Sequence, residues 1–130
     1  MTNYDAVGRC GTHIDRVETP DTAISLGSGD LPVLATPRVV AWLEAAAVAA
    51  LEGLPPEMTT VGIHIAVDHT APAIVGAEIR AEAKVIRTEE ARIEFAVNAY
   101  EGDQIVAQGT HIRVMVDRRR FMARAGLETG

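Results

Sequence analysis

The sequence predicts an α+β fold in which a curved, five-stranded antiparallel sheet wraps around one central helix. Three observations predict it: one strong helical segment, a series of later segments in which apolar and polar residues alternate, and short links between those segments. Alternation with a period of two places one strand face in the core and the other in water, which is typical of antiparallel sheets. One helix can cover five strands only if the sheet curls around it.

The N-terminal part is expected to form a weak strand followed by a long loop. Residues 8–19 carry Ile14 and Val17 among polar residues, which indicates a strand. Residues 20–37 are punctuated by Gly, Pro and Asp, which predicts a loop. Loops of this length in a small domain are often functional.

The central helix is predicted over residues 39–51. Thr36 and Pro37 form a start signal, because a hydroxyl can cap the first turn and proline suits the first helical position. The stretch is rich in Ala, the best helix former, and Gly53 with the following proline pair ends it. Apart from Glu44 the helix is apolar all round, which predicts burial on most of its sides.

Four alternating strands are expected after the helix, at residues 61–67, 78–87, 92–100 and 104–117. The links at 88–91 and 101–103 are short enough for hairpins. No linker rich in Gly, Ser or Pro divides the chain, and its length suits one hydrophobic core. Residues 1–130 are therefore expected to form a single domain.

Charge and composition exclude several classes of function. The net charge of −6 argues against nucleic acid as a partner. No apolar run approaches the roughly 20 residues of a membrane span. Residues 1–5 lack the basic and apolar regions of a signal peptide, so we expect a cytoplasmic protein without a membrane partner.

Cysteine and metal chemistry are not expected either. Cys10 has no partner for an internal disulfide or a thiolate zinc site. No spacing of His, Asp or Glu suggests a metal site, and no Gly-rich loop opens a helix as in a nucleotide-binding fold. The hydrophobic fraction is largely Ala and Val, with few aromatic residues, so each buried side chain contributes little and a partner subunit would help to stabilise the fold.

Glu44 is the strongest candidate for chemistry from the residues alone. A carboxylate in an apolar helix is costly to desolvate unless it is paired or neutral. A buried carboxyl can serve as an acid or base near neutral pH, and two roles are open, nucleophilic attack or activation of a water. The competing interpretation is that Glu44 lies on an exposed edge of the helix.

Thr36, Gly62 and His69 each have a structural and a functional interpretation. Thr36 either caps the helix, worth about 1 kcal/mol, or faces a ligand. Eight residues of helix separate it from Glu44 by about 12 Å, which favours a pairing of these two across a subunit interface or through a substrate. Gly62 either packs against the helix or lets a ligand approach its backbone N–H. His69 ends its strand and titrates near neutrality, whereas His64 falls on the opposite face of the pleat.

Three segments of the chain resemble the small acyl-CoA thioesterases of the fluoroacetyl-CoA thioesterase family, which have the hot-dog fold. The segments are residues 33–51, 62–72 and 107–121. Their motifs are Ala35-Thr36-Pro37, Trp42-Leu43-Glu44-Ala45, Gly62-Ile63-His64-Ile65-Ala66-Val67-Asp68-His69-Thr70-Ala71 and Gly109-Thr110-His111-Ile112-Arg113.

The resemblance implies hydrolysis of a small or medium acyl-CoA to a free acid and CoA. It places catalytic residues at Thr36, Glu44 and His69, with the backbone N–H of Gly62 as oxyanion donor. It also implies a homodimer or a dimer of dimers with sites between subunits, and no cofactor beyond the CoA of the substrate. The residues expected to bind substrate are Gly62, Leu34, His111 and Arg113.

The loop ahead of the helix departs from this family. Its members place aromatic residues there as a hydrophobic lid, whereas residues 21–35 contain none. Fluoroacetyl specificity is therefore not implied. We expect a more open pocket, lined by Leu31, Val33 and Leu34, for another short or medium acyl group.

Other interpretations remain open at this point. A non-catalytic hot-dog protein that binds acyl-CoA or another small ligand is the main alternative. A dehydratase would need a His in the loop at residues 21–35, and none is present. A structural dimerisation domain leaves Glu44 unexplained. The basic run at residues 118–120 is either a solvated tail or a contact to the CoA phosphates.

Overall fold

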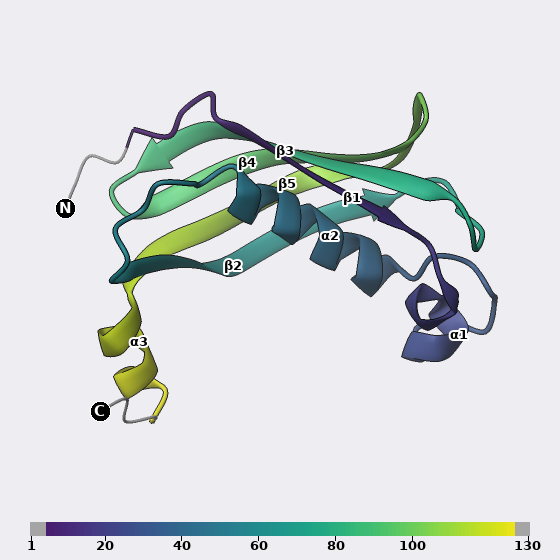
Figure 1. Ribbon diagram of the computed structural model, residues 1–130, viewed down its shortest axis with the longest axis horizontal. Coiled ribbons are helices and arrows are strands. Elements are labelled where there is room, and N and C mark those ends of the chain that lie inside the picture. Colours follow the sequence, from purple (N-terminus) through teal and green to yellow (C-terminus); the bar gives the residue numbers. More distant parts are fainter. Residues whose placement is uncertain (1–4, 127–130) are drawn as a thin grey trace.

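The computed structural model describes residues 5–126 and shows a curved antiparallel sheet with one long helix on its concave face (Figure 1). The sheet order is β1-β3-β4-β5-β2, with every neighbouring pair antiparallel. The predicted fold class is confirmed. In chain order the elements are β1 (Cys10–Arg16), the 3-10 turn η1 (Thr19–Asp21), α1 (Ala23–Leu26), α2 (Thr36–Ala49), β2 (Met58–His69), β3 (Glu78–Glu89), β4 (Arg92–Glu101), β5 (Gln104–Asp117) and α3 (Arg118–Arg124).

Two segments expected to be irregular contain short helices. Within residues 20–37, η1 and α1 are tied together by Thr22, whose hydroxyl donates to the Thr19 carbonyl at 2.8 Å. Residues 118–124 form α3 instead of a plain tail, because the Asp117 carboxylate accepts a hydrogen bond from the Arg120 amide at 3.0 Å. In Figure 1, α3 projects away from the sheet.

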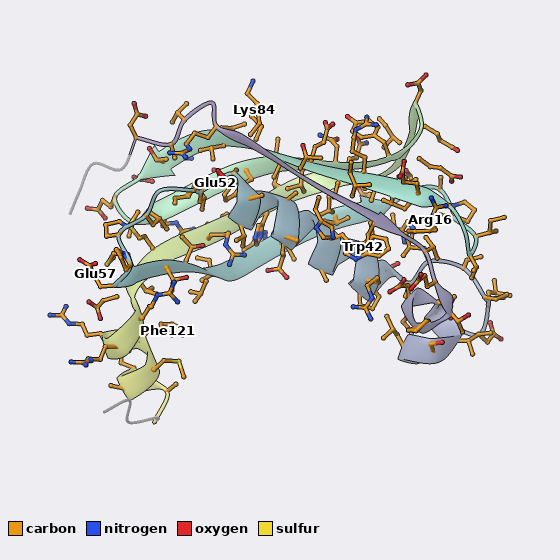
Figure 2. All side chains as sticks on the ribbon, viewed as in Figure 1. Arg16, Trp42, Glu52, Glu57, Lys84 and Phe121 are labelled. Atoms are coloured by element: carbon orange, nitrogen blue, oxygen red, sulfur yellow. The ribbon has the colours of Figure 1, made fainter. Side chains whose placement is uncertain are left out.

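The core lies between α2 and the concave face of the sheet. Small side chains allow α2 to approach the sheet closely. A Cβ at Gly11 of β1 would collide with the main chain of Ala46 and Ala50. Figure 2 shows Trp42 on α2, where it is mostly buried. The buried residues of the helix are Val39, Trp42, Leu43, Ala46 and Ala47.

The opposite side of α2 is uncovered in the single chain. Ala41 is exposed, and Val48 has 52% of its surface exposed. Both lie within four residues of Glu44, on the same helical stripe. The expectation that this helix is buried on most of its sides is therefore wrong for one chain by itself.

Strand β2 forms an edge of the sheet, and none of its residues is buried. Its register against β5 shifts between Gly62 and His64, which makes Ile63 an extra residue in a β-bulge. Gly62 pairs with Arg113 and His69 pairs with Ala107. Since those two partners are six residues apart on β5, Gly62 and His69 lie on the same concave face. Without the bulge, their odd separation would put them on opposite faces.

No helix within residues 5–126 is both long and apolar enough to cross a membrane. The first four residues, on which the expected lack of a signal peptide partly rests, lie outside the described residues.

Candidate active site

The residues predicted for the site fall into two clusters on the concave side of the sheet. Glu44 of α2 meets Gly62 of β2 with Arg113 and His111 of β5. In the second cluster, Thr36 of α2 contacts His69 at the end of β2.

Glu44 extends from the middle of α2 toward the bulge in β2. Its Oε2 atom lies 3.4 Å from Arg113 Nη1 and 3.8 Å from His111 Nε2. A Cβ at Gly62 would lie 2.6 Å from the same oxygen, so any larger residue there would displace this carboxylate from its position.

The predicted burial of Glu44 is not observed in the single chain. Its side chain is 40% exposed, so the competing interpretation of an exposed edge holds in part. The Arg113 guanidinium forms an ion pair with this carboxylate on the side that faces the sheet.

Arg113 is held from the opposite side by Thr60 of β2. Its Nε atom donates to the Thr60 hydroxyl at 2.9 Å, and Nη2 donates to the Thr60 carbonyl at 3.1 Å. Burial lowers the pKa of Arg113, whereas the charge of Glu44 raises it. Because most of its N–H groups are committed within the protein, this arginine faces the Glu44 carboxylate and is poorly placed to bind a CoA phosphate.

The Thr36 hydroxyl does not cap the helix. Ala35 is the N-cap residue, so Thr36 is the first helical residue and Pro37 the second. The freed hydroxyl lies 2.8 Å from His69 Nδ1. The structure therefore pairs Thr36 with His69, and the capping interpretation is wrong.

His69 is partly desolvated beside the start of α2. Burial lowers the pKa of His69, which the main chain of Ala71 partly offsets, so the neutral ring is favoured. Its Nε2 atom is buried without a hydrogen-bond partner among residues 5–126. A buried ring nitrogen without a partner is costly, and a bound ligand could satisfy it.

A cavity of about 280 Å³ opens beside this Thr–His pair. Val33 and Leu34 line it, as predicted for the acyl pocket, whereas Leu31 lies outside the lining and is 60% exposed. The lining contains no Phe, Tyr or Trp. Its members are Ala23, Ser28, Val33, Leu34, Ala35, Thr36, His69, Thr70, Ala71 and Pro72.

The two clusters are far apart within one chain. Eight residues of α2 separate Thr36 from Glu44 by about 12 Å. Seven residues of β2 separate Gly62 from His69 by about 20 Å. A single acyl carbon cannot touch both clusters of one chain.

Two functional contacts escaped the sequence analysis. Thr60, which holds Arg113, carries no motif. The His64 carbonyl oxygen lies 2.8 Å from His111 Nδ1, and this contact depends on the backbone geometry at the bulge. The glycine at position 62 is the one local signal, because glycine in a strand often marks a bulge or a close approach. The described part of the chain contains no group of three His, Cys, Asp or Glu residues that could hold a metal ion.

Solved structures share this architecture. The structure of the fluoroacetyl-CoA thioesterase FlK matches with a TM-score of 0.85 at 29% identity, over 95% of this chain and 97% of that one. A substituted form of FlK in complex with acetyl-CoA matches at 0.86 and 28% identity, over 92% and 96%. A hot-dog-like protein from Thermanaerovibrio acidaminovorans matches at 0.84 and 25% identity, over 92% and 90%. The fold and these likenesses define a thioester hydrolase of the hot-dog class.

The family follows from the sequence itself. A profile of the fluoroacetyl-CoA-specific thioesterase family matches residues 17–119, so this chain belongs to that family. The resemblance drawn from the motifs around Thr36, Glu44 and His69 is thereby confirmed. No curated protein sequence matches the chain significantly.

Proposed function

We propose that the protein hydrolyses acyl-CoA thioesters in a site shared by two copies of the chain. Glu44 and the Gly62 backbone N–H of one copy act on the thioester carbonyl. Thr36 and His69 of the other copy face the acyl group and the departing sulfur. The observation that carries this proposal is the separation of two chemically complementary clusters within one chain.

Two balanced routes use Glu44. In one, its carboxylate attacks the carbonyl carbon, the C–S bond breaks, and water later hydrolyses the mixed anhydride. In the other, Glu44 takes a proton from a water whose oxygen attacks the same carbon. In both routes the tetrahedral oxyanion receives a hydrogen bond from Gly62, and the CoA thiolate takes up a proton.

The Thr36–His69 pair offers a proton path for the leaving group. If the Thr36 hydroxyl donates to Nδ1, the neutral ring carries its proton on Nε2, where no described residue accepts it. That N–H can donate to a substrate oxygen or sulfur. If the ring has the other tautomer, Nδ1–H donates to the Thr36 hydroxyl, which becomes the acceptor, and Nε2 accepts a hydrogen bond from the ligand instead.

Several features support a second copy as the partner. Strand β2 presents an unpaired edge, and such edges readily pair with another chain. Two β2 edges related by a two-fold axis run antiparallel, which brings the Gly62 end of one strand toward the His69 end of the other. The apolar side of α2 around Glu44, which includes Val48, is also exposed in the single chain and would be buried by a second copy.

The cavity favours an acyl group other than fluoroacetyl. It is lined by small and aliphatic residues and contains no aromatic lid. Its volume of about 280 Å³ exceeds the needs of a two-carbon acyl group. We propose short to medium apolar acyl groups as the substrate class.

The nucleotide half of CoA carries phosphates, and α3 offers matching charge. Arg119, Arg120 and Arg124 form no ion pair with the described residues, in a chain whose net charge is −6. Arg118 lies five residues beyond Arg113 along β5, which is about 17 Å of extended chain. An extended pantetheine arm spans a comparable distance, so the phosphates would reach this helix from a thioester held at Glu44.

A thiol-release screen over acyl-CoAs of increasing chain length tests the proposal. We expect turnover by the wild type and its loss in Glu44→Gln and His69→Ala. The control variants Glu57→Gln and His13→Gln remove the same groups from other parts of the chain and should retain activity. Unchanged turnover in Glu44→Gln would refute the site, and calorimetric binding without thiol release would favour the non-catalytic alternative.

The two routes differ in the fate of water oxygen. A single turnover in ¹⁸O-labelled water can place the label in the Glu44 carboxyl only if a mixed anhydride forms. Mass spectrometry of the peptide that contains Glu44 reads the result. Label in the Glu44 carboxyl therefore establishes the anhydride route, whereas label solely in the released acid shows only that water attacked the acyl carbon.

A further inference from the structure

The His111 ring lies at the centre of the Glu44 cluster but does not face solvent. It is 1% exposed and stacks on Phe95 of β4, with ring centroids 5.8 Å apart. Residues from α2, β2 and β5 surround its two nitrogens. A side chain this enclosed is poorly suited to touch substrate, which leaves its function in the site to be explained.

The hydrogen bond on one side of the ring determines its tautomer. Nδ1 lies 2.8 Å from the His64 carbonyl oxygen, which can only accept. Nδ1 must therefore carry a proton, and in the neutral ring Nε2 has a free lone pair. That lone pair faces Arg113 Nη1 at 3.2 Å.

Arg113 Nη1 is shared between two acceptors. One of its protons points to His111 Nε2, and the other points to Glu44 Oε2 at 3.4 Å. Thr60 holds the rest of the guanidinium. The orientation of the positive charge beneath Glu44 thus depends on an unprotonated Nε2.

We infer that His111 is a positioning residue, which in its neutral Nδ1–H form holds Arg113 against Glu44, and that a proton on Nε2 disables Glu44. This inference rests on the proposed thioesterase function. It assigns His111 a role different from the substrate contact expected from the sequence.

The charges around the ring explain why protonation would be disruptive. Arg113 on β5 and Glu44 on α2 face Nε2, His64 on β2 lies nearby, and Phe95 from β4 is uncharged. Protonation would place an N–H on Nε2, facing the N–H of Arg113 Nη1 at 3.2 Å, where no hydrogen bond can form. The new N–H would donate to the Glu44 carboxylate instead. A carboxylate that receives this extra hydrogen bond is a weaker nucleophile and a weaker base.

The ring is neutral under ordinary conditions. Burial lowers the pKa of His111, and the Arg113 charge acts in the same direction, while the His64 carbonyl and Glu44 oppose the shift. Protonation therefore begins only on the acid side of the usual histidine range.

Two substitutions separate positioning from packing. His111→Gln supplies an amide N–H for the His64 carbonyl and an oxygen for Arg113, but cannot be protonated near neutral pH. We expect it to retain most of kcat at pH 7.5 and to extend activity to lower pH. His111→Phe keeps the stacking on Phe95 without either nitrogen. We expect it to lower kcat about 10- to 100-fold, with little change in KM.

Three results would overturn the inference. The first is an unmoved acid limb of kcat/KM in His111→Gln. The second is a rise in KM alone in His111→Phe. The third is a kcat of His111→Phe equal to that of the wild type at pH 7.5. The matched control His13→Gln should leave the acid limb where it is in the wild type. If His111→Phe fails to fold, the pH profile of His111→Gln decides by itself.

A second readout distinguishes this inference from the proposed function. Nitrogen-15 NMR of the histidine rings should show His111 protonated at Nδ1 and unprotonated at Nε2 at pH 7.5. Protonation at Nε2 instead would overturn the positioning role even if the enzyme is active. Absence of thiol release from every acyl-CoA would overturn the proposed function and the inference together.

Discussion

At the scale of single residues, Gly62 shows how a missing side chain shapes the site. The space that a Cβ would occupy is filled by Glu44 Oε2, and His111 Cε1 would lie 3.1 Å away. A methyl group at this position would push the carboxylate off Arg113. The glycine therefore makes room for the Glu44 carboxylate in its position beside Arg113.

Gly62→Ala should reduce catalysis without unfolding the protein. We expect kcat to fall on the order of 10- to 100-fold, because displacement of a reacting group by about 1 Å has an effect of this size. The free energy of unfolding should change little, since Ala is preferred over Gly in a strand by roughly 0.5–1 kcal/mol and this gain offsets part of the strain. Thiol-release kinetics and urea unfolding measure the two quantities. A normal kcat, or a loss of activity that accompanies loss of folding, would contradict the assignment.

The residue types of the site could be predicted from the sequence, but some of their partners could not. Glu44 stands out in an apolar helix, and the Thr-Pro pair marks a helix start. Which residue becomes the N-cap depends on local backbone angles, and here Ala35 takes that position. The consequence, a Thr36 hydroxyl free to meet His69, follows only from the structure.

At the scale of elements, the bulge in β2 is the feature that sequence periodicity misses. Regular alternation puts Gly62 and His69 on opposite faces of the strand. One inserted residue, Ile63, brings both to the concave side. Alternation therefore predicted the strands and the hairpins, but could not predict this change of face within one strand.

The short helix α3 provides a prediction about CoA. Replacing Arg119 and Arg120 together by Ala should raise KM for acyl-CoA about 2- to 30-fold, because each exposed ion pair contributes roughly 0.2–1 kcal/mol. The effect should shrink at high salt. It should be absent for an acyl-N-acetylcysteamine thioester, which has no phosphates.

Arg92→Ala provides a matched control for α3. It removes an exposed positive charge from β4, on another part of the chain. KM values for both thioesters, measured side by side, decide the question. An equal rise in KM for the thioester without phosphates would contradict a phosphate contact.

At the scale of the whole molecule, one buried histidine, His111, and one partly buried histidine, His69, make stability depend on pH. Burial lowers the pKa of His69 and of His111 in the folded chain. Between the ordinary value of about 6.5 and these lowered values, the unfolded chain binds more protons than the folded chain. Stability should therefore be full above about pH 7 and fall as the pH is lowered through this window.

Urea unfolding at pH 7.5, 6.5 and 5.5 measures how the free energy of unfolding depends on pH. These pH values lie above the range in which carboxylates titrate. His69→Gln and His111→Gln should each flatten the curve, whereas His13→Gln should leave its slope unchanged. Stability that is constant, or that rises toward pH 5.5, would show that these rings are not held neutral in the folded protein.

The largest-scale prediction concerns the two halves of the site. Thr36→Val and Glu44→Gln should each be inactive as pure proteins, because each spoils every site of a homodimer. In a mixed dimer, one site carries both substitutions and the other carries neither. Unfolding and refolding the two variants together in equal amounts should therefore restore about one quarter of wild-type activity, since half of the dimers are mixed and each has one intact site. Thr36→Val with His69→Ala is the matched control: both lie in the same half, so every site in their mixed dimer stays defective. Activity restored in the first mixture but not in the second requires a site built from two chains. Activity restored in neither mixture would show that Glu44 and Thr36 do not act in one shared site.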